Sequence, residues 1–238
     1  MELAVRRIAA FAAVVAGAHA GPVVSSVPPL RGLWPRLAGR GHPDHVALTF
    51  DDGPDDRGTP QVLDVLAAAD VHATFFVLGT MVERHPEVLN RVIAEGHEVA
   101  VHSWDHRNHL RHPPPVVHRQ LARTAEMVQR HSGHRPRWFR PPYGVLTGGA
   151  LMAARDLRLQ PVLWTAWGRD WEEDATGDSV SRLLMHQMRG GGTVLLHDSD
   201  CTSAPNSWRA TVEALPAVLE RCRVLGLRVG TVGAHGLT

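Results

Sequence analysis

The sequence predicts an α/β fold in which parallel strands form a partly open (β/α)7-type barrel. Short apolar runs alternate with amphipathic helical patterns from about residue 45 onward, the order of elements expected for a parallel sheet covered by helices. About seven strand–helix units can be distinguished, one fewer than the eight of a complete barrel. Polar residues directly follow several of the runs, as expected where chemistry gathers at the carboxyl ends of parallel strands.

The expected strands are short and apolar, and they lie at His45–Phe50, Ala73–Leu78, Glu98–Val101, Arg137–Arg140, Pro161–Trp164, Thr193–Leu196 and Leu227–Val232. The expected helices lie between them, at Thr59–Ala69, Met81–Glu95, Pro115–His131, Gly148–Leu157, Ser179–Met188 and Trp208–Leu225. Apolar residues in the helical segments recur three and four positions apart, for example at Val62, Leu66 and Ala69, so they share one helix face. Such a face can pack on the sheet.

Composition divides the chain into four segments. Residues 44–232 carry the alternating pattern and are predicted to form the single domain. Residues 21–43 contain several Pro, Gly and Arg without a clear period, so we expect a connecting segment. Residues 1–20 are predicted to be a signal peptide or an N-terminal helix, and residues 233–238 a C-terminal tail.

The amino terminus resembles an export signal. Arg6 and Arg7 precede an apolar stretch, and Ala18-His19-Ala20 fits a cleavage site with small residues. The stretch is too short to cross a bilayer as a helix. We therefore expect a secreted protein or one anchored at the cell surface. If residues 1–20 instead form a helix of the domain, the expectation is a cytoplasmic protein.

Composition also excludes several function classes. The net charge of +1 indicates neither nucleic acid nor an anionic membrane surface as a partner. For the oligomeric state, we expect a monomer. All 25 basic residues are Arg, which excludes a Schiff-base lysine and a phosphate-loop NTPase. No G-x-G-x-x-G motif is present, so no nucleotide cofactor is expected. Cys201 and Cys222 are too few for a disulfide framework, and whether they form one bridge stays open.

Two adjacent carboxylates follow the first predicted strand. Asp51 and Asp52 come directly after an apolar run and are followed by Gly53-Pro54, which favours a turn. Neighbouring side chains on an extended segment point in opposite directions. The two acids can therefore have different roles, one as a metal ligand and the other in proton transfer.

A candidate metal site combines one of these acids with two histidines. His102 and His106 have a His-x3-His spacing, which brings both imidazoles to one side of a helical turn or tight loop. Together with Asp52 they make a two-histidine, one-carboxylate set that leaves positions open for water and substrate. Zn²⁺ is the expected ion, and Co²⁺, Ni²⁺ or Fe²⁺ fit the same ligands. His109 and His112 are expected at the surface.

Other polar residues follow other predicted strands. Arg140 closes one strand, Asp170 lies beyond the next, and His197 directly follows the strand Thr193–Leu196. Because the carboxyl ends of barrel strands share one rim, these residues are predicted to lie near the candidate metal site.

At this point the sequence resembles a known family. Its motifs are Thr49–Pro54, His102–His106, Arg140-Pro141-Pro142-Tyr143-Gly144, Asp170-Trp171 and Leu195-Leu196-His197-Asp198. In order and type they resemble the five motifs of the polysaccharide deacetylases, the NodB-homology enzymes of carbohydrate esterase family 4. The resemblance covers residues 44–232 and implies a distorted (β/α) barrel.

The resemblance also implies a reaction, the metal-assisted hydrolysis of an N-acetyl group on a sugar. A metal-bound water would attack the amide, with an Asp as base and a His as acid. The resemblance implies that Asp51 is the base, held by Arg140, and that His197 is the acid, oriented by Asp170. The implied metal ligands are Asp52, His102 and His106. The implied substrate-binding residues are Pro142, Tyr143, Trp171 and Leu195, with the Tyr143 N–H near the oxyanion.

One position departs from the family pattern. The family often carries an acid three residues before the Asp-Trp pair, whereas this chain has Trp167 there. Trp164, Trp167 and Trp171 are interpreted either as core packing or as an aromatic wall against a sugar ring. Polymer specificity therefore does not transfer from the family.

Three functions remain in competition. The leading hypothesis is a metal-dependent deacetylase acting on an N-acetylglucosamine-containing glycan, such as peptidoglycan or a chitin-like oligomer. The second is hydrolysis of a small metabolite amide, or of an acetyl ester such as that of xylan, on the same scaffold. The third is a non-catalytic glycan-binding barrel. The last predicts loss of the base or of a metal ligand, and the sequence keeps all four of these residues.

Overall fold

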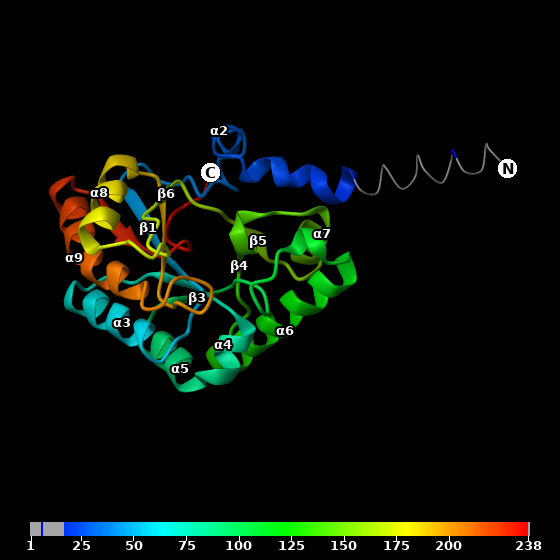
Figure 1. The fold of residues 1–238 in the computed structure, drawn as a ribbon, viewed down its shortest axis with the longest axis horizontal. Coiled ribbons are helices and arrows are strands. Elements are labelled where there is room, and N and C mark those ends of the chain that lie inside the picture. The colour runs from blue at the N-terminus through cyan, green and yellow to red at the C-terminus, as the bar shows by residue number, and fades with distance from the viewer. Residues whose placement is uncertain (1–5, 7–16, 238) are drawn as a thin grey trace.

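The computed structural model describes residue 6 and residues 17–237 and shows one parallel sheet surrounded by helices (Figure 1). The strands are β1 (His45–Asp51), β2 (Thr74–Val77), β3 (Glu98–Val101), β4 (Trp138–Phe139), β5 (Gln160–Pro161), β6 (Ala166–Trp167), β7 (Thr193–His197) and β8 (Arg228–Gly230). The α-helices are α2 (Pro28–Arg31), α3 (Gly58–Ala68), α4 (Gly79–Arg84), α5 (Pro86–Ala94), α6 (Pro114–Ser132), α7 (Gly148–Asp156), α8 (Gly177–Gln187) and α9 (Trp208–Val224). Three 3₁₀ turns, η1 (Gly21–Ser26), η2 (His109–Arg111) and η3 (Pro142–Gly144), complete the described elements.

The sheet is an open barrel. Its strands pair in parallel in the order β5-β4-β3-β2-β1-β7-β6, and β8 pairs with the start of β1. β1 lies at the centre, and all seven of its residues are buried. Its burial on both faces explains its continuous apolar sequence. The predicted partly open parallel barrel is thus confirmed.

The gap between the two end strands, β5 and β6, is covered by the segment that precedes β1. The backbone N–H of Leu163 donates to the carbonyl of Leu37 (2.7 Å), and the Arg31 guanidinium donates to the carbonyl of Trp164 (2.9 Å). Gly39 accepts from the Thr193 hydroxyl at the start of β7 (2.7 Å). In Figure 1 this blue segment lies along the side of the barrel next to the C-terminus. Residues 21–43, predicted as a connecting segment, therefore also pack against the domain.

The core lies between the strands and the surrounding helices. Its largest cluster joins strand residues such as Phe50 and Leu196 to helix residues such as Leu63 and Leu215. A smaller cluster fills the space between β3, β4 and the pair α6 and α7. Burying these side chains contributes roughly 1.5–3 kcal/mol for each large one, which fixes the strands that carry the site.

Two elements differ from the sequence prediction. The single helix predicted at Met81–Glu95 is wrong, because the structure has two helices, α4 and α5, separated at His85. Pro86 disfavours helical backbone at the residue before it, and His85 accordingly has φ −131° and ψ 54°. The strand predicted at Pro161–Trp164 is β5, which lies at Gln160–Pro161, and the two-residue strand β6 that follows was not predicted.

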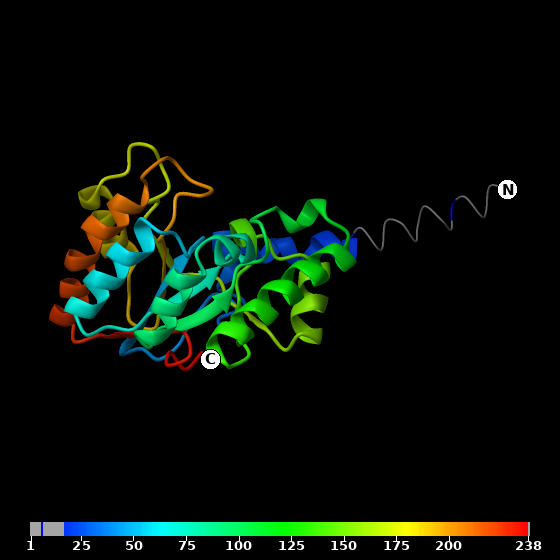
Figure 2. The same ribbon diagram turned by 90° about the horizontal axis from the view of Figure 1, so that it is seen from below.

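Local signals place the helices near the site. The Thr147 hydroxyl accepts from the N–H of Ala150 and caps α7, while Thr176 and Ser179 form a capping box at the start of α8. α8 and α9 follow the two loops that project side by side from one face of the molecule (Figure 2). The N–H of Ala204 in the second loop donates to the carbonyl of Trp171 in the first (3.1 Å).

Most of the predicted leader, residues 1–20, lies outside the described residues. Among the described helices, none is both long enough and apolar enough to cross a membrane. Both cysteines are free thiols, with Cys201 exposed in a loop and Cys222 buried in the core. The structure therefore shows no bridge between them.

Candidate metal-dependent active site

Asp52, His102 and His106 meet at the carboxyl end of the central strands. The Oδ1 atom of Asp52 lies 3.4 Å from Nε2 of His102 and 3.5 Å from Nε2 of His106. One donor atom of each residue lies within 4.8 Å of the donor atoms of the other two, and all three residues are buried. The juxtaposition on which the sequence prediction depended is present.

The hydrogen bonds of this cluster fit a divalent cation. Nδ1 of His102 donates to the backbone carbonyl of Arg140 (2.8 Å), which leaves Nε2 as a bare nitrogen facing the cluster. Oδ1 of Asp52 is buried without a hydrogen-bond partner, while Oδ2 accepts from the Thr202 hydroxyl. An unpaired carboxylate oxygen between two imidazoles costs free energy unless a cation compensates it. Burial also holds the pKa of His102 and of His106 below the usual value, so both imidazoles are neutral, as metal ligands must be.

The backbone at the cluster is unusual. Asp52, Ser103, His106 and Tyr143 have positive φ values of 79°, 103°, 54° and 59°. Each such conformation costs a non-glycine residue about 1–3 kcal/mol and persists only where the surrounding structure imposes it. Three of these four residues, Asp52, His106 and Tyr143, line the cavity of the cluster.

The turn after β1 requires a glycine. The Gly53 N–H donates to Oδ1 of Asp198 (3.2 Å), and a Cβ on Gly53 would lie 2.2 Å from Oδ2 of that carboxylate. The Thr59 hydroxyl donates to the same Asp198 (2.5 Å), whose pKa is raised to about 7 by burial. Asp198 thus ties the turn that carries Asp51 and Asp52 to the end of β7.

Asp51 is held beside the cluster by Arg140. The Nη1 atom of Arg140 donates to Oδ1 of Asp51 (2.7 Å) and to the Thr49 hydroxyl (2.8 Å), and the guanidinium also contacts the carbonyls of Val162 and Leu163. Arg140 is completely buried. Burial raises the pKa of Asp51 to about 6, although the guanidinium opposes the shift. The free Oδ2 of Asp51 lies 3.7 Å from Nε2 of His102, on the side of the cluster.

His197 faces the same cavity from the end of β7. Its Nδ1 lies 3.1 Å from Oδ1 of Asp170, whose other oxygen accepts from the His197 N–H and from the Thr211 hydroxyl, both at 2.6 Å. Burial disfavours the imidazolium, but the carboxylate of Asp170, with those of Asp52 and Asp51, raises the pKa of His197 to about 9. Asp170 follows β6, not the strand after which it was expected.

One cavity of about 250 Å³ is lined by Asp51, Asp52, His102, His106 and His197, together with Tyr143, Gly144, Trp164, Trp167, Trp171, Leu195, Thr202 and Ser203. Arg140 and Asp170 lie behind it and do not line it. The Tyr143 ring lies edge-on to His106, with the centroids 4.5 Å apart, and Trp171 lies edge-on to His197 at 5.5 Å. Trp167 lies between Trp164 and Trp171, with centroids 6.0 and 5.1 Å away. The three tryptophans therefore form one wall of the cavity.

Some placements were not foreseen. Pro142 is buried in η3 and is not among the residues that line the cavity. The surface position expected for His109 is wrong, because its side chain is buried, 2.9 Å from the Ser103 hydroxyl and stacked near Phe139. Thr202 contacts Asp52 from a loop whose sequence is typical of a surface loop. The two residues are 150 positions apart, so no local sequence pattern indicates this contact.

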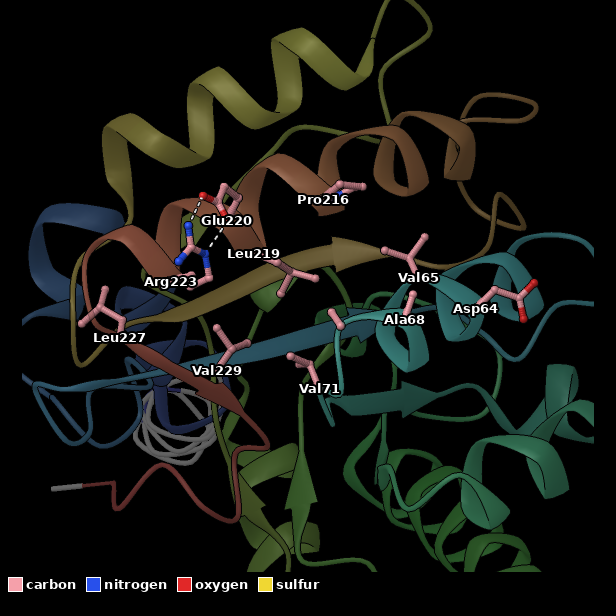
Figure 3. Close-up of a pocket in the computed structure, with 11 residues that line it drawn as sticks. Asp64, Val65, Ala68, Val71, Pro216, Leu219, Glu220, Arg223, Leu227 and Val229 are labelled. Atoms are coloured by element: carbon pink, nitrogen blue, oxygen red, sulfur yellow. Dashed lines mark hydrogen bonds and ion pairs between the residues drawn. The ribbon is translucent and has the colours of Figure 1, made fainter.

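A larger hollow lies elsewhere in the described part of the molecule. It measures about 720 Å³ between α3 and α9, beside β8. Figure 3 shows the apolar side chains of Val65, Leu219 and Val229 around it, with the Glu220–Arg223 ion pair at its edge. It shares no lining residue with the cavity of the metal cluster and contains no histidine. We therefore place the chemistry in the smaller cavity.

Comparison with known proteins gives matches along most of the chain. The sequence model described as polysaccharide deacetylase matches residues 38–162. A chitooligosaccharide deacetylase of Bradyrhizobium is 38% identical over 187 residues, which cover 74% of this chain and 85% of that protein. A peptidoglycan-N-acetylglucosamine deacetylase of Bacillus cereus is 32% identical over 188 residues, or 79% of this chain, and the match spans 66% of that protein's length.

A solved structure shares the fold. The peptidoglycan N-acetylglucosamine deacetylase Bc1960, in complex with 4-naphthalen-1-yl-N-oxidanyl-benzamide, superposes with a TM-score of 0.79 at 29% sequence identity. The superposition covers 89% of this chain and 97% of that one.

Proposed function

This chain belongs to the polysaccharide deacetylase family, and we propose that it is a metal-dependent N-deacetylase of an N-acetylglucosamine-containing glycan, either peptidoglycan or a chitin-like oligomer. One observation carries the proposal. A cluster fit for a divalent cation lies in one cavity between an Arg-held carboxylate, Asp51, and an Asp-held imidazole, His197.

The three ligands of the cation would be Asp52, His102 and His106, with Zn²⁺ as the expected ion. When bound, a divalent cation polarises the acetyl carbonyl and makes a neighbouring water more acidic. The ligand set contains no thiolate, so Co²⁺, Ni²⁺ or Fe²⁺ would also be accepted.

Asp51 supplies the base. Arg140 occupies its Oδ1, so Oδ2 is the oxygen that accepts the proton of the attacking water. With its pKa at about 6, Asp51 is ionised at neutral pH and still basic enough to take the proton. A cation bound next to it would lower that pKa further.

His197 supplies the acid. Its Nδ1–H donates to Asp170, which leaves Nε2–H as the proton for the departing nitrogen. With its pKa at about 9, the ring is an imidazolium at neutral pH, ready to donate. The amine leaves only when protonated, so base and acid must be charged at the same time, and their pKa values allow this between about 6 and 9.

The remaining side chains position the substrate. We propose that the backbone N–H of Tyr143 helps to bind the oxyanion and that Trp171 and Leu195 contact the sugar and its acetyl group. Trp164 and Trp167 extend this apolar wall. The presence of base, acid and all three ligands disfavours a non-catalytic binding protein.

The decisive experiment combines metal analysis with acetate release. The purified protein would be stripped with a chelator, reloaded with Zn²⁺, and assayed on N-acetylchitooligosaccharides, peptidoglycan fragments and acetylated xylan. We expect about one ion per chain, and acetate from the N-acetyl substrates only after reloading. Acetate from xylan alone would favour an esterase, and stoichiometric metal without acetate from any substrate would contradict the proposal. A glycan polymer as substrate also agrees with the expected secretion or surface anchoring, which stays a prediction.

A further inference from the structure

A second hollow adjoins the catalytic cavity. It measures about 620 Å³ and is lined by Asp105, His106, Arg107, Asn108, Arg111, His112, Tyr143 and Thr202. Three of these, His106, Tyr143 and Thr202, also line the cavity of the metal cluster. The two hollows therefore adjoin, and together they make a cleft with the tryptophan wall lining one part and the loop 105–112 lining the other.

The loop end of the cleft is cationic. Arg107 is two-thirds exposed and Arg111 is also exposed. The only acid in the lining, Asp105, has both oxygens engaged: Oδ1 accepts from Gln120 (3.1 Å) and Oδ2 from Nε of Arg107 (3.0 Å). Among the described residues, no ion pair engages the guanidinium of Arg111, and Asp105 is the only ion-pair partner of Arg107. Donors of both side chains thus remain for a ligand.

The position of Arg111 is imposed by the buried face of the same loop. η2 carries Arg111 and begins at His109, which is buried against Phe139 and hydrogen-bonded to Ser103. The Asn108 side chain accepts from the N–H of Leu110 and caps this turn. The loop is therefore anchored, and its arginine is presented at the edge of the cleft.

We infer that this cationic end binds a carboxylate on the sugar next to the one being deacetylated, so the substrate is an acidic glycan and not a neutral chitin-like chain. The inference rests on the proposed function. With the acetamido group at the metal cluster, a neighbouring sugar that extends past His106 and Tyr143 would enter the second hollow, beside the arginines. Guanidinium groups pair with carboxylates in a fork geometry, which suits this end. The carboxylate could be the lactyl group of a muramyl sugar or the acid group of a uronate.

The main comparison uses two forms of one substrate that differ only in charge. We would measure kcat/KM for acetate release from a peptide-free N-acetylglucosamine–N-acetylmuramic acid tetrasaccharide, and from the same oligomer with its carboxylates methyl-esterified. N-acetylchitotetraose and a hyaluronan tetrasaccharide would serve as the neutral and uronate arms. The Zn²⁺-loaded wild type is expected to prefer an acid form over its neutral counterpart by about fivefold or more, and less so at high salt.

The double variant Arg107→Gln/Arg111→Gln should lose that preference, lowering the ratio of the two rates about fivefold. Arg155→Gln, at an exposed arginine in the last turn of α7, is the matched control and should keep it. A preference for the muramyl or the hyaluronan arm identifies the source of the carboxylate. Equal rates on charged and neutral forms, or a preference that survives in the double variant, would overturn the inference while leaving the deacetylase assignment intact. Absence of acetate from every substrate would instead refute the proposed function.

Discussion

Two pairs of buried histidines lie at opposite ends of the barrel and differ in how their hydrogen bonds are completed. The rings of His45 and His235 are 5.0 Å apart, and those of His102 and His106 are 5.1 Å apart. In the first pair, Nδ1 meets Nδ1 at 2.8 Å, and Nε2 of His235 points at the carbonyls of Gly39 and Gly191. We call this the closed pair, because both ring nitrogens of His235 have hydrogen-bond partners.

The second pair is left open. Its Nε2 atoms face Oδ1 of Asp52, which has no hydrogen-bond partner, and Nδ1 of His106 is also buried without one. Burial and spacing are nearly the same in the two pairs, so neither distinguishes a structural pair from a ligand site. The unsatisfied polar atoms do distinguish them, because a divalent cation at this point would compensate the Asp52 oxygen and accept a lone pair from each imidazole. The following changes test this contrast in order of decreasing effect.

Removing a ligand should have the largest effect. His106→Ala is expected to lose the metal and to lower kcat/KM roughly 10³-fold or more, because the cation contributes several kcal/mol to the transition state. Elemental analysis of the purified variant and acetate release measure the two losses. His235→Ala is the matched control and should retain the metal. Full metal occupancy in His106→Ala would show that the open pair is not the ligand site.

Changing the base should separate chemistry from metal binding. Asp51→Asn is expected to keep its ion but to reduce kcat roughly 10²–10⁴-fold, since the amide cannot accept the proton of water. The measurement is kcat alongside metal content. Rapid turnover by this variant would contradict the assigned role.

The pH profile should report both charged groups. Activity is expected to rise as Asp51 loses its proton near pH 6, or lower with the cation bound, and to fall as His197 loses its proton near pH 9. Asp170→Asn removes the carboxylate that raises the pKa of His197, so the alkaline limb should move to lower pH and kcat/KM should drop roughly 10²-fold. An unchanged alkaline limb in Asp170→Asn would exclude His197 as the acid that sets it.

The hydroxyl of Thr202 should have an intermediate effect. It bonds to Oδ2 of Asp52 and so directs Oδ1 toward the histidines. Thr202→Val is expected to weaken metal affinity roughly 10–100-fold, the usual cost of losing a partner of a metal ligand. Competition with a fluorescent chelator measures the affinity, and Thr202→Ser should restore it.

A substitution in the closed pair should lower the stability of the fold without changing metal binding or activity. His45→Gln is expected to cost about 1–3 kcal/mol in the free energy of unfolding, because it leaves a buried partner unsatisfied, with metal content and kcat unchanged. Burial lowers the pKa of His45 to about 4 from its usual value near 6.5, so the unfolded chain binds more protons between those values. Wild-type stability should therefore fall as pH drops from about 6.5 to about 4, and the variant should show a shallower fall in urea unfolding.

The open barrel and the trio Asp52, His102 and His106 could be predicted because the patterns behind them are local in the sequence. These patterns are apolar runs that alternate with helical segments, the turn after the first strand, and the His-x3-His spacing. The strand Ala166–Trp167 was not predicted, because two residues are too few to show the alternation of apolar and polar side chains that indicates a strand. The hydrogen bond from Thr202 to Asp52 was missed for another reason. It joins two loops that follow β1 and β7, which are paired in the sheet but lie far apart in the sequence, so no local pattern predicts the contact.

The gap between β5 and β6 affects how the tryptophan wall is held in place. In the described residues no strand pairing joins β5 to β6, and the segment 162–165 between them is held by hydrogen bonds from Leu163 to Leu37 and from Arg31 to Trp164. Arg31 also stacks over Trp164 at 4.7 Å, so its position sets where that indole stands. The segment before β1 therefore helps to position the Trp164 indole on the cavity wall, although none of these contacts involves a residue of the metal cluster.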